Sequence, residues 1–201
     1  MPATEERVAR AAAPPRRHDP WSVGMWGMAL FVATESALFG VLIVTYFYLR
    51  FDAVQWPPRG TEEPALLYPL LLLGGLVVSA VLVQLAAAGA RRRRRAPTVA
   101  YLAAALALQG AYLGLEIVLF HQDLQDMSPH DSAYASAYFM LLGLHHAHVA
   151  LGILLVAYVL GRSACGLTTY RARGVQAVAL YWLVVAAFAV AVTLTVLSPS
   201  L

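Results

Sequence analysis

Charged residues are scarce in this chain of 201 residues. Only 12 % are Asp, Glu, Lys or Arg, whereas a soluble domain carries about a quarter. Hydrophobic residues make up 60 % of the chain, and the mean hydropathy is +0.66. This composition excludes a disordered chain, a nucleic-acid binder and an ordinary cytoplasmic enzyme. It predicts an integral membrane protein with little mass outside the bilayer.

Lysine is absent, so all 14 basic residues are arginine. The single cysteine, Cys165, excludes a disulfide within the chain. The sequence contains no nucleophile elbow, phosphate-binding loop, HExxH motif or CxxC motif, and it therefore offers no self-contained catalytic site. No internal repeat is evident, which leaves an inverted-repeat transporter without support.

Five apolar stretches are long enough to cross a membrane, for which about 20 residues are needed. The predicted all-α membrane domain covers residues 25–201, with helices near 25–49, 66–88, 99–120, 135–160 and 177–197. Residues 1–24 form a polar tail. A signal peptide is not expected, because the first apolar stretch begins only after about twenty polar residues and is too long for a signal sequence.

The arginines predict the orientation of the helices. Twelve of the 14 lie in the N-terminal tail or in the segments that follow the second and fourth stretches, which share one side of the membrane. Because positively charged segments stay in the cytoplasm, the N-terminus is expected inside and the C-terminus outside. The contiguous arginines 91–95 are most simply a topology signal and a contact for anionic lipids.

Two patterns concern the surfaces of the helices. Aromatic residues near the ends of the stretches are expected in interfacial belts: Trp21, Trp26, Tyr46, Tyr48, Tyr181 and Trp182. Small residues at helical spacing predict close helix packing by two pairs: Gly75 with Ser79, and Gly110 with Gly114. We therefore expect a packed five-helix bundle and not five independent anchors.

Five ionisable side chains lie within the apolar stretches: Glu35, Glu116, His145, His146 and His148. Each costs about 2.5–3.5 kcal/mol on insertion scales, so each requires an explanation. Glu35 and His145 lie about ten residues into their stretches, about 15 Å from the edge and near the midplane. His145 and His148 share a helix face, whereas His146 is turned about 100° away. Glu116 is expected close to the outer surface.

The residues leave several roles open for these side chains. Glu35 is a neutral hydrogen-bonded contact between helices, a proton-handling group or a contact for a lipid headgroup. His145 and His148 are a hydrogen-bonded core pair or, as the alternative, haem or metal ligands. His146 packs or faces a polar pocket, and Glu116 extends its carboxylate to the interface.

Two segments carry recognisable motifs. The first is WGMALFVATE at 26–35, followed by Phe39 and by YFYLR at 46–50. The second comprises Tyr134, Phe139, GLHHAHV at 143–149 and Gly152. Together they resemble the cytochrome c oxidase subunit III family, whose patterns are W-G-M-x-L-F-[IV]-x-[ST]-E, F, Y-F-x-x-R and Y, F, G-F-H-x-x-H-V, G. The resemblance covers residues 21–201 and places Glu35 on the family's buried glutamate.

The chain also departs from the family pattern. It begins at what would be the third of seven spans, as many bacterial members do. Glu116 stands where the family has a glutamine, and Leu119 replaces a glutamate. In the last span Leu183 and Ala186 replace a histidine and an aspartate. These departures suggest a divergent member, and they leave the related accessory protein of a nitric oxide reductase as an alternative.

The resemblance implies a non-catalytic accessory subunit of a haem–copper terminal oxidase of aerobic respiration. Such a subunit carries no haem, copper or other metal. It flanks catalytic subunit I, beside subunit II, in the bacterial inner membrane. It holds phospholipid in a cleft between helix groups, and it supports proton uptake and oxygen access. In that setting Glu35, His145 and His148 are hydrogen-bonding and lipid-contact residues.

The sequence without the resemblance is compatible with two other classes of membrane protein. One is a stand-alone membrane haem or metal protein that uses His145, His148 and Glu116. The other is a proton or small-solute transporter built around Glu35.

Overall fold

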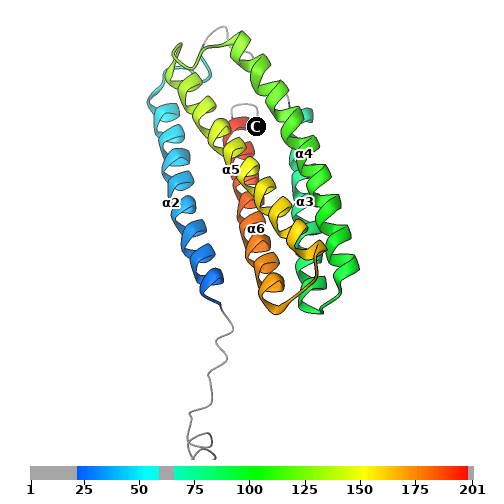
Figure 1. The fold of residues 1–201 in the computed structure, drawn as a ribbon. Coiled ribbons are helices and arrows are strands. Elements are labelled where there is room, and N and C mark those ends of the chain that lie inside the picture. Colours follow the sequence, from blue (N-terminus) through cyan, green and yellow to red (C-terminus); the bar gives the residue numbers. More distant parts are fainter. Residues whose placement is uncertain (1–21, 59–65, 199–201) are drawn as a thin grey trace, which may run out of the picture.

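The computed structural model describes residues 22–58 and 66–198, and all the long elements within these ranges are helices (Figure 1). They are α2 (Val23–Asp52), α3 (Leu67–Arg91), α4 (Arg95–Asp126), α5 (Ala133–Ala164) and α6 (Thr169–Leu197). Each of the 5 helices is long and apolar enough to cross a membrane. The predicted all-α membrane protein with five spanning helices is therefore confirmed.

The helices extend beyond the predicted apolar stretches because polar residues cap and prolong their ends. α6, for example, begins at Thr169 and not near residue 177. The Ser132 hydroxyl accepts a hydrogen bond from the Ala135 N–H at 3.1 Å, and the Thr168 hydroxyl accepts one from the Arg171 N–H at 3.3 Å. These caps satisfy amides that the first turn of a helix leaves unpaired. Of the predicted polar tail, residues 1–21 lie outside the described residues, and Val23 and Gly24 belong to α2.

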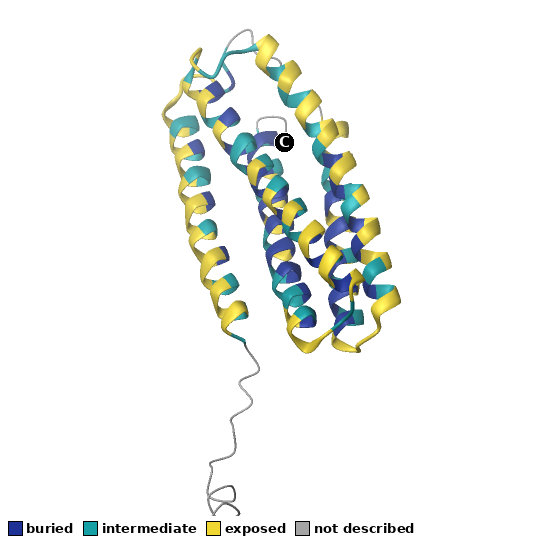
Figure 2. Cartoon of the chain, in the orientation of Figure 1, coloured by how far each residue is buried: buried dark blue, intermediate teal, exposed yellow. Residues whose placement is uncertain are grey.

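Four of the helices form a ring and the fifth packs on its outside. In the ring α3 packs against α4 and α6, and α5 also packs against α4 and α6. α2 packs against α5 and α6, and within the described part of the chain it contacts neither α3 nor α4. Figure 1 shows α2 as the blue helix set apart from the ring, and Figure 2 shows that most of its surface is exposed. α6 contacts three helices and is the most deeply buried span.

A narrow stripe attaches α2 to the ring. Its buried residues are Val32, Phe39 and Tyr46, which recur every seventh position and therefore lie on one face after two turns. The Phe39 ring stacks on Phe188 of α6 with the centroids 4.2 Å apart. Tyr46 is fully buried, and its hydroxyl accepts a hydrogen bond from Trp56 Nε1 at 3.1 Å. The prediction that Tyr46 lies in an interfacial belt is therefore wrong.

α5 and α6 approach each other closely at Gly152. A Cβ atom at this position would lie 2.8 Å from the Trp182 ring, so only glycine fits the observed packing. Trp182 Nε1 donates to the Gly152 carbonyl at 3.2 Å, and the Tyr181 hydroxyl donates to the His148 carbonyl at 2.8 Å. Both aromatic residues belong to the bundle core, so the prediction of an interfacial position for them is wrong. Because lipid is as apolar as the interior of the bundle, the hydrophobicity of the sequence does not show which face of a membrane helix points inwards.

The predicted packing by small residues is only partly realised. Gly110 and Gly114 on α4 are exposed, and no atom would lie within 4 Å of a Cβ added at either position. The expectation that they hold two helices of this chain together is thus corrected. Gly75 also has open space where its Cβ would be, whereas Ser79 is fully buried and its hydroxyl donates to the Leu76 carbonyl at 2.8 Å.

The two ends of the bundle differ in charge. At one end α2, α4 and α6 begin, and the arginines there are 91–95, Arg162, Arg171 and Arg173. We call this the arginine end. The opposite or acidic end carries Asp52, Asp123, Asp126 and Asp131, and of the described arginines it holds Arg50 alone.

Candidate functional site

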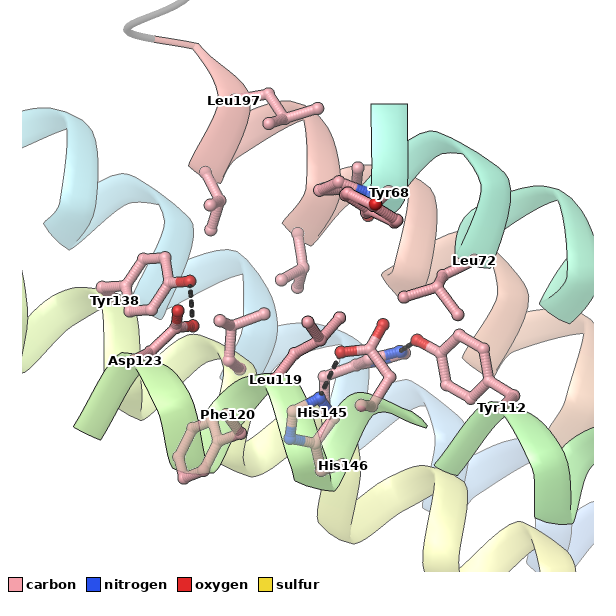
Figure 3. Close-up of a pocket in the computed structure, with 16 residues that line it drawn as sticks. Tyr68, Leu72, Tyr112, Leu119, Phe120, Asp123, Tyr138, His145, His146 and Leu197 are labelled. Carbon is pink, nitrogen blue, oxygen red and sulfur yellow. Dashed lines mark hydrogen bonds and ion pairs between the residues drawn. The ribbon is translucent and has the colours of Figure 1, made fainter. Parts of the chain in front are cut away.

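Helix α5 carries three histidines within about one turn, and each contacts a different side chain. His148 faces Glu35 on α2, His146 faces Glu116 on α4, and His145 faces Tyr112 on α4. Figure 3 shows the two contacts with α4. Successive residues of a helix point about 100° apart, and this rotation distributes the three rings over the neighbours of α5.

The first of these contacts joins α5 to α2. His148 Nε2 lies 2.8 Å from Glu35 Oε2, and His148 Nδ1 lies 2.8 Å from the Leu144 carbonyl oxygen. A carbonyl oxygen only accepts hydrogen bonds, so Nδ1 carries a hydrogen and donates it. The next proton then lies between Nε2 and the carboxyl group, and the pair is either imidazole with carboxylic acid or imidazolium with carboxylate. Both forms have no net charge, which suits a site between membrane helices.

Two aromatic rings contact the histidine of this pair. The Phe39 ring meets the His148 ring edge to face with the centroids 5.2 Å apart, and the Phe188 ring lies 6.3 Å from the same histidine. Phe39 follows Glu35 by four residues and therefore lies on the same face of α2. Glu35 and Phe39 of the first motif thus meet His148 of the second in space.

The second contact joins α5 to α4. His146 Nε2 lies 3.0 Å from Glu116 Oε2, and the Phe120 ring meets the His146 ring edge to face at 5.3 Å. Glu116 was expected to extend to the interface. It points into the bundle instead, because a polar partner lies on the facing helix. His146 was expected to pack or to face a polar pocket, and it lines the cavity described next.

A cavity of about 210 Å³ lies between α3, α4, α5 and α6 towards the acidic end (Figure 3). The polar residues in its lining are Tyr68, Tyr112, Glu116, Asp123, Tyr138, His145, His146 and Thr193. The Tyr138 hydroxyl donates to Asp123 Oδ2 at 2.6 Å. The remaining wall is mostly apolar and includes Leu72 and Leu119. An apolar cavity with a few converging polar groups is the usual form of a small-molecule or water site.

Two buried side chains, one in the cavity wall and one outside it, have incomplete hydrogen bonding. His145 is 3 % exposed; its Nε2 makes a long contact of 3.4 Å with the Tyr112 hydroxyl, and its Nδ1 has no partner among the described residues. Gln109 on α4 is fully buried, and neither atom of its amide has a partner in that part of the chain. Sequence reasoning missed Gln109 and Tyr112. Tyr112 precedes Glu116 by four residues and Gln109 precedes it by seven, so all three lie along one face of α4, and this spacing is the signal that indicates them.

His145 and His148 are both buried on α5. The two rings serve different partners, Tyr112 and Glu35, and Glu116 contacts neither. Within residues 22–58 and 66–198, no three His, Cys, Asp or Glu side chains are grouped as metal ligands would be. The chemistry that the site offers is therefore that of two imidazole–carboxyl pairs, each able to hold a proton without net charge.

Two substitutions of Glu116, which contacts His146, should differ in their effect on the stability of the protein. Glu116→Gln should leave the stability nearly unchanged, because the amide donates to His146 Nε2. Glu116→Leu should cost about 1 kcal/mol, at the low end for an unpaired polar group, because water in the adjoining cavity can replace the lost partner. Thermal unfolding in detergent measures both effects, and the exposed neighbour Ile117→Leu is the control. A glutamine variant as unstable as the leucine variant would contradict this reasoning.

Comparison with known proteins is consistent with both motif segments. The family model for cytochrome c oxidase subunit III matches residues 20–197. A cytochrome c oxidase subunit 3 of Synechocystis sp. is 31 % identical over 161 residues, which cover 79 % of this chain and 68 % of the relative. The cytochrome bo(3) ubiquinol oxidase subunit 3 of Pseudomonas aeruginosa is 28 % identical over 167 residues, or 82 % of this chain and 79 % of the relative.

A third relative is also named as a subunit of a quinol oxidase. The probable quinol oxidase subunit 3 of Staphylococcus aureus is 29 % identical over 162 residues, covering 80 % of this chain and 79 % of the relative. The matched residues 20–197 contain all five helices in full and both imidazole–carboxyl pairs that α5 forms. This chain therefore belongs to the cytochrome c oxidase subunit III family.

Proposed function

We propose that this chain is a cofactor-free accessory subunit of a haem–copper terminal oxidase and binds its catalytic subunit I and subunit II in the membrane. Haem and copper belong to the catalytic partner in this proposal. The observation that carries it is the contact of 2.8 Å between Glu35 and His148, which brings the two motif segments of the family together. The named relatives are subunits of cytochrome c and quinol oxidases.

The role of the Glu35–His148 pair is to position α2. This helix is held by one narrow stripe, and its other faces remain exposed and apolar, with Leu30, Val41 and Val44 more than half exposed. Such a surface suits contact with lipid or with another membrane subunit. In this role α2 stabilises the catalytic subunit and borders the path by which lipid and oxygen reach it. The two imidazole–carboxyl pairs support proton uptake, because each can take up and release a proton.

Affinity purification of the tagged chain in mild detergent tests this proposal. A haem spectrum and a copurifying catalytic subunit, identified by mass spectrometry, are the expected result. The turnover of the purified complex with oxygen or with nitric oxide then distinguishes an oxidase from a nitric oxide reductase. A colourless preparation that contains this chain alone would overturn the accessory-subunit role and would leave Glu35 as a candidate transport or lipid site.

The arginine asymmetry supports an inner-membrane orientation with the N-terminus in the cytoplasm. Cys165 provides the test, because it is the only cysteine and is exposed at the arginine end. A membrane-impermeant maleimide should label Cys165 in inverted membrane vesicles and leave it unlabelled in intact spheroplasts. Labelling after detergent solubilisation is the control for accessibility. Labelling of spheroplasts would reverse the orientation.

A further inference from the structure

Four oxidisable aromatic rings are in contact at the acidic end. Trp56 is half-buried in the segment that follows α2. Its ring meets the rings of Tyr46 and Tyr134 edge to face, with the centroids 5.3 Å and 5.1 Å apart. The Tyr134 ring stacks on the ring of Tyr138, one turn further along α5, at 5.9 Å. These separations are those of rings in direct contact. We call the four residues the aromatic series.

All four rings belong to the residue types that lose a single electron most readily among aromatic side chains. Phenol and indole rings are oxidised far more easily than the ring of phenylalanine. Because each ring of the aromatic series touches the next, an electron can pass along the series without movement of any group. The aromatic series therefore connects the segment after α2 with the second turn of α5 as a path for electrons.

The hydroxyl group of Tyr138 distinguishes it from the other rings. It donates to Asp123 Oδ2 at 2.6 Å (Figure 3). Among the described residues, no carboxylate accepts a hydrogen bond from Tyr46 or Tyr134. A phenol that loses an electron becomes strongly acidic, and a carboxylate at hydrogen-bond distance is a base positioned to take its proton. Tyr138 is therefore the ring of the aromatic series that is oxidised most easily.

Trp56 occupies the opposite position in this order. Its Nε1–H donates to the Tyr46 hydroxyl at 3.1 Å, and a neutral hydroxyl group is too weak a base to remove that hydrogen. An indole radical that keeps its proton is a stronger oxidant than a phenoxyl radical whose proton has passed to a carboxylate. Trp56 is also partly exposed. Transfer of an oxidising equivalent from Trp56 to Tyr138 is therefore favourable.

We propose that the aromatic series is a redox relay that carries an oxidising equivalent from Trp56 to Tyr138. A one-electron oxidant, such as a radical derived from peroxide, takes one electron from Trp56 and leaves an indole radical cation. One electron then passes from Tyr138 through Tyr134 to the indole, while the Tyr138 hydroxyl proton moves to Asp123 Oδ2. The products are neutral Trp56, a neutral tyrosyl radical and a protonated Asp123, so electrons and charge balance.

The relay is reset by one electron. A one-electron reductant of the ascorbate class reduces the tyrosyl radical, and Asp123 returns the proton to Tyr138. Both residues line the cavity of about 210 Å³, which gives a small molecule room beside the pair. By holding the oxidising equivalent at one repairable site, the relay spares the neighbouring side chains. This inference does not rest on the proposed accessory role.

The test uses the full-length chain in detergent, with photogenerated tris(bipyridine)ruthenium(III) as the one-electron oxidant. Transient absorption and electron paramagnetic resonance measure the tyrosyl radical. Tyr138→Phe keeps the ring and removes the hydroxyl group, so it should abolish most of the long-lived signal. Tyr48→Phe is the control, because Tyr48 lies on α2 near the same end and is 68 % exposed; it should leave the signal unchanged. Equal signals in the two variants would place the radical on other tyrosines and overturn the relay.

Two further variants test the base and the entry point. Asp123→Asn keeps a hydrogen-bond acceptor that cannot take the proton, and it should slow radical formation about a hundredfold, the low end for a positioned base. Trp56→Phe keeps a ring that is not oxidised and should lower the yield of the Tyr138 radical; an equal yield would exclude Trp56 as the entry point. Thermal unfolding shows that each variant has folded. In the unaltered chain, which needs no substitution, radical formation should be slower in D₂O. Absence of this isotope effect, or an unchanged rate in Asp123→Asn, would overturn the transfer to Asp123 and with it the relay.

Discussion

Replacing Trp182 with alanine should destabilise the protein by about 3–5 kcal/mol, the range for a tryptophan removed from a well-packed core. Trp182 is fully buried at the contact between α5 and α6, and its ring fills the space that the missing side chain of Gly152 leaves. Removal of the ring opens a cavity and leaves the Gly152 carbonyl without the indole donor. Because α6 contacts α2, α3 and α5, this damage reaches most of the bundle.

Matched variants separate the causes of this loss. Leu183→Ala is the control, because Leu183 is the next residue on α6 and is 56 % exposed; it should change stability little. Trp182→Phe keeps an aromatic ring and loses the donor, so it should fall between the two. Gly152→Ala should also destabilise, by about 1–3 kcal/mol, because the added methyl group overlaps the ring. Thermal unfolding in detergent measures the series. Equal midpoints for Trp182→Ala and Leu183→Ala would exclude a core role for Trp182.

The helices themselves were predictable because a membrane span has a simple physical signature. An unpaired backbone polar group is too costly in hydrocarbon, so an apolar stretch of sufficient length must be helical. The ends were less predictable. Ser132 and Thr168 show the reason: a hydroxyl that caps a helix extends it into polar sequence that hydropathy assigns to a loop.

The inward faces were the least predictable feature. Lipid is as apolar as a helix interface, so hydrophobicity does not indicate which side of a membrane helix is buried. The sequence therefore predicts interfacial positions for Tyr46, Tyr181 and Trp182, although all three are buried. It predicts helix packing at Gly110 and Gly114, although both are exposed.

Polar residues inside the spans were found from sequence, but their partners were not. The cost of burying Glu35, Glu116 and the histidines identifies them as residues that need a partner. Which partner each one takes depends on the rotation of α5 between α2 and α4. That rotation is fixed by contacts far apart in the chain, such as Trp182 against Gly152 and Phe39 against Phe188. Periodicity within one helix contains no information about it.

Replacing Glu35 with leucine should loosen α2 from the ring. The Nδ1–H of His148 is bound to the Leu144 carbonyl, so its Nε2 would lose its only partner among the described residues. An unpaired buried polar group costs about 1–3 kcal/mol, and the aromatic rings around His148 leave little room for water to replace the carboxyl group. Glu35→Gln should be tolerated, because its amide donates to Nε2 and keeps the pair without net charge.

The double variant makes this prediction specific to the pair. Glu35→Leu combined with His148→Leu removes both partners, so it should be less unstable than the sum of the two single variants. Hydrogen exchange of the α2 amides locates the effect, and retention of the chain in the purified complex measures its consequence for assembly. α2 has no contact with α3 or α4 in the described part of the chain, so the loss should be confined to α2 and the face of α5 and α6 beneath it. Equal retention and equal exchange in Glu35→Gln and Glu35→Leu would show that the carboxyl group holds no structural contact. A loss of oxidase turnover in Glu35→Gln, with assembly and exchange unchanged, would instead assign the pair to proton transfer, because the amide preserves the contact but cannot pass on a proton.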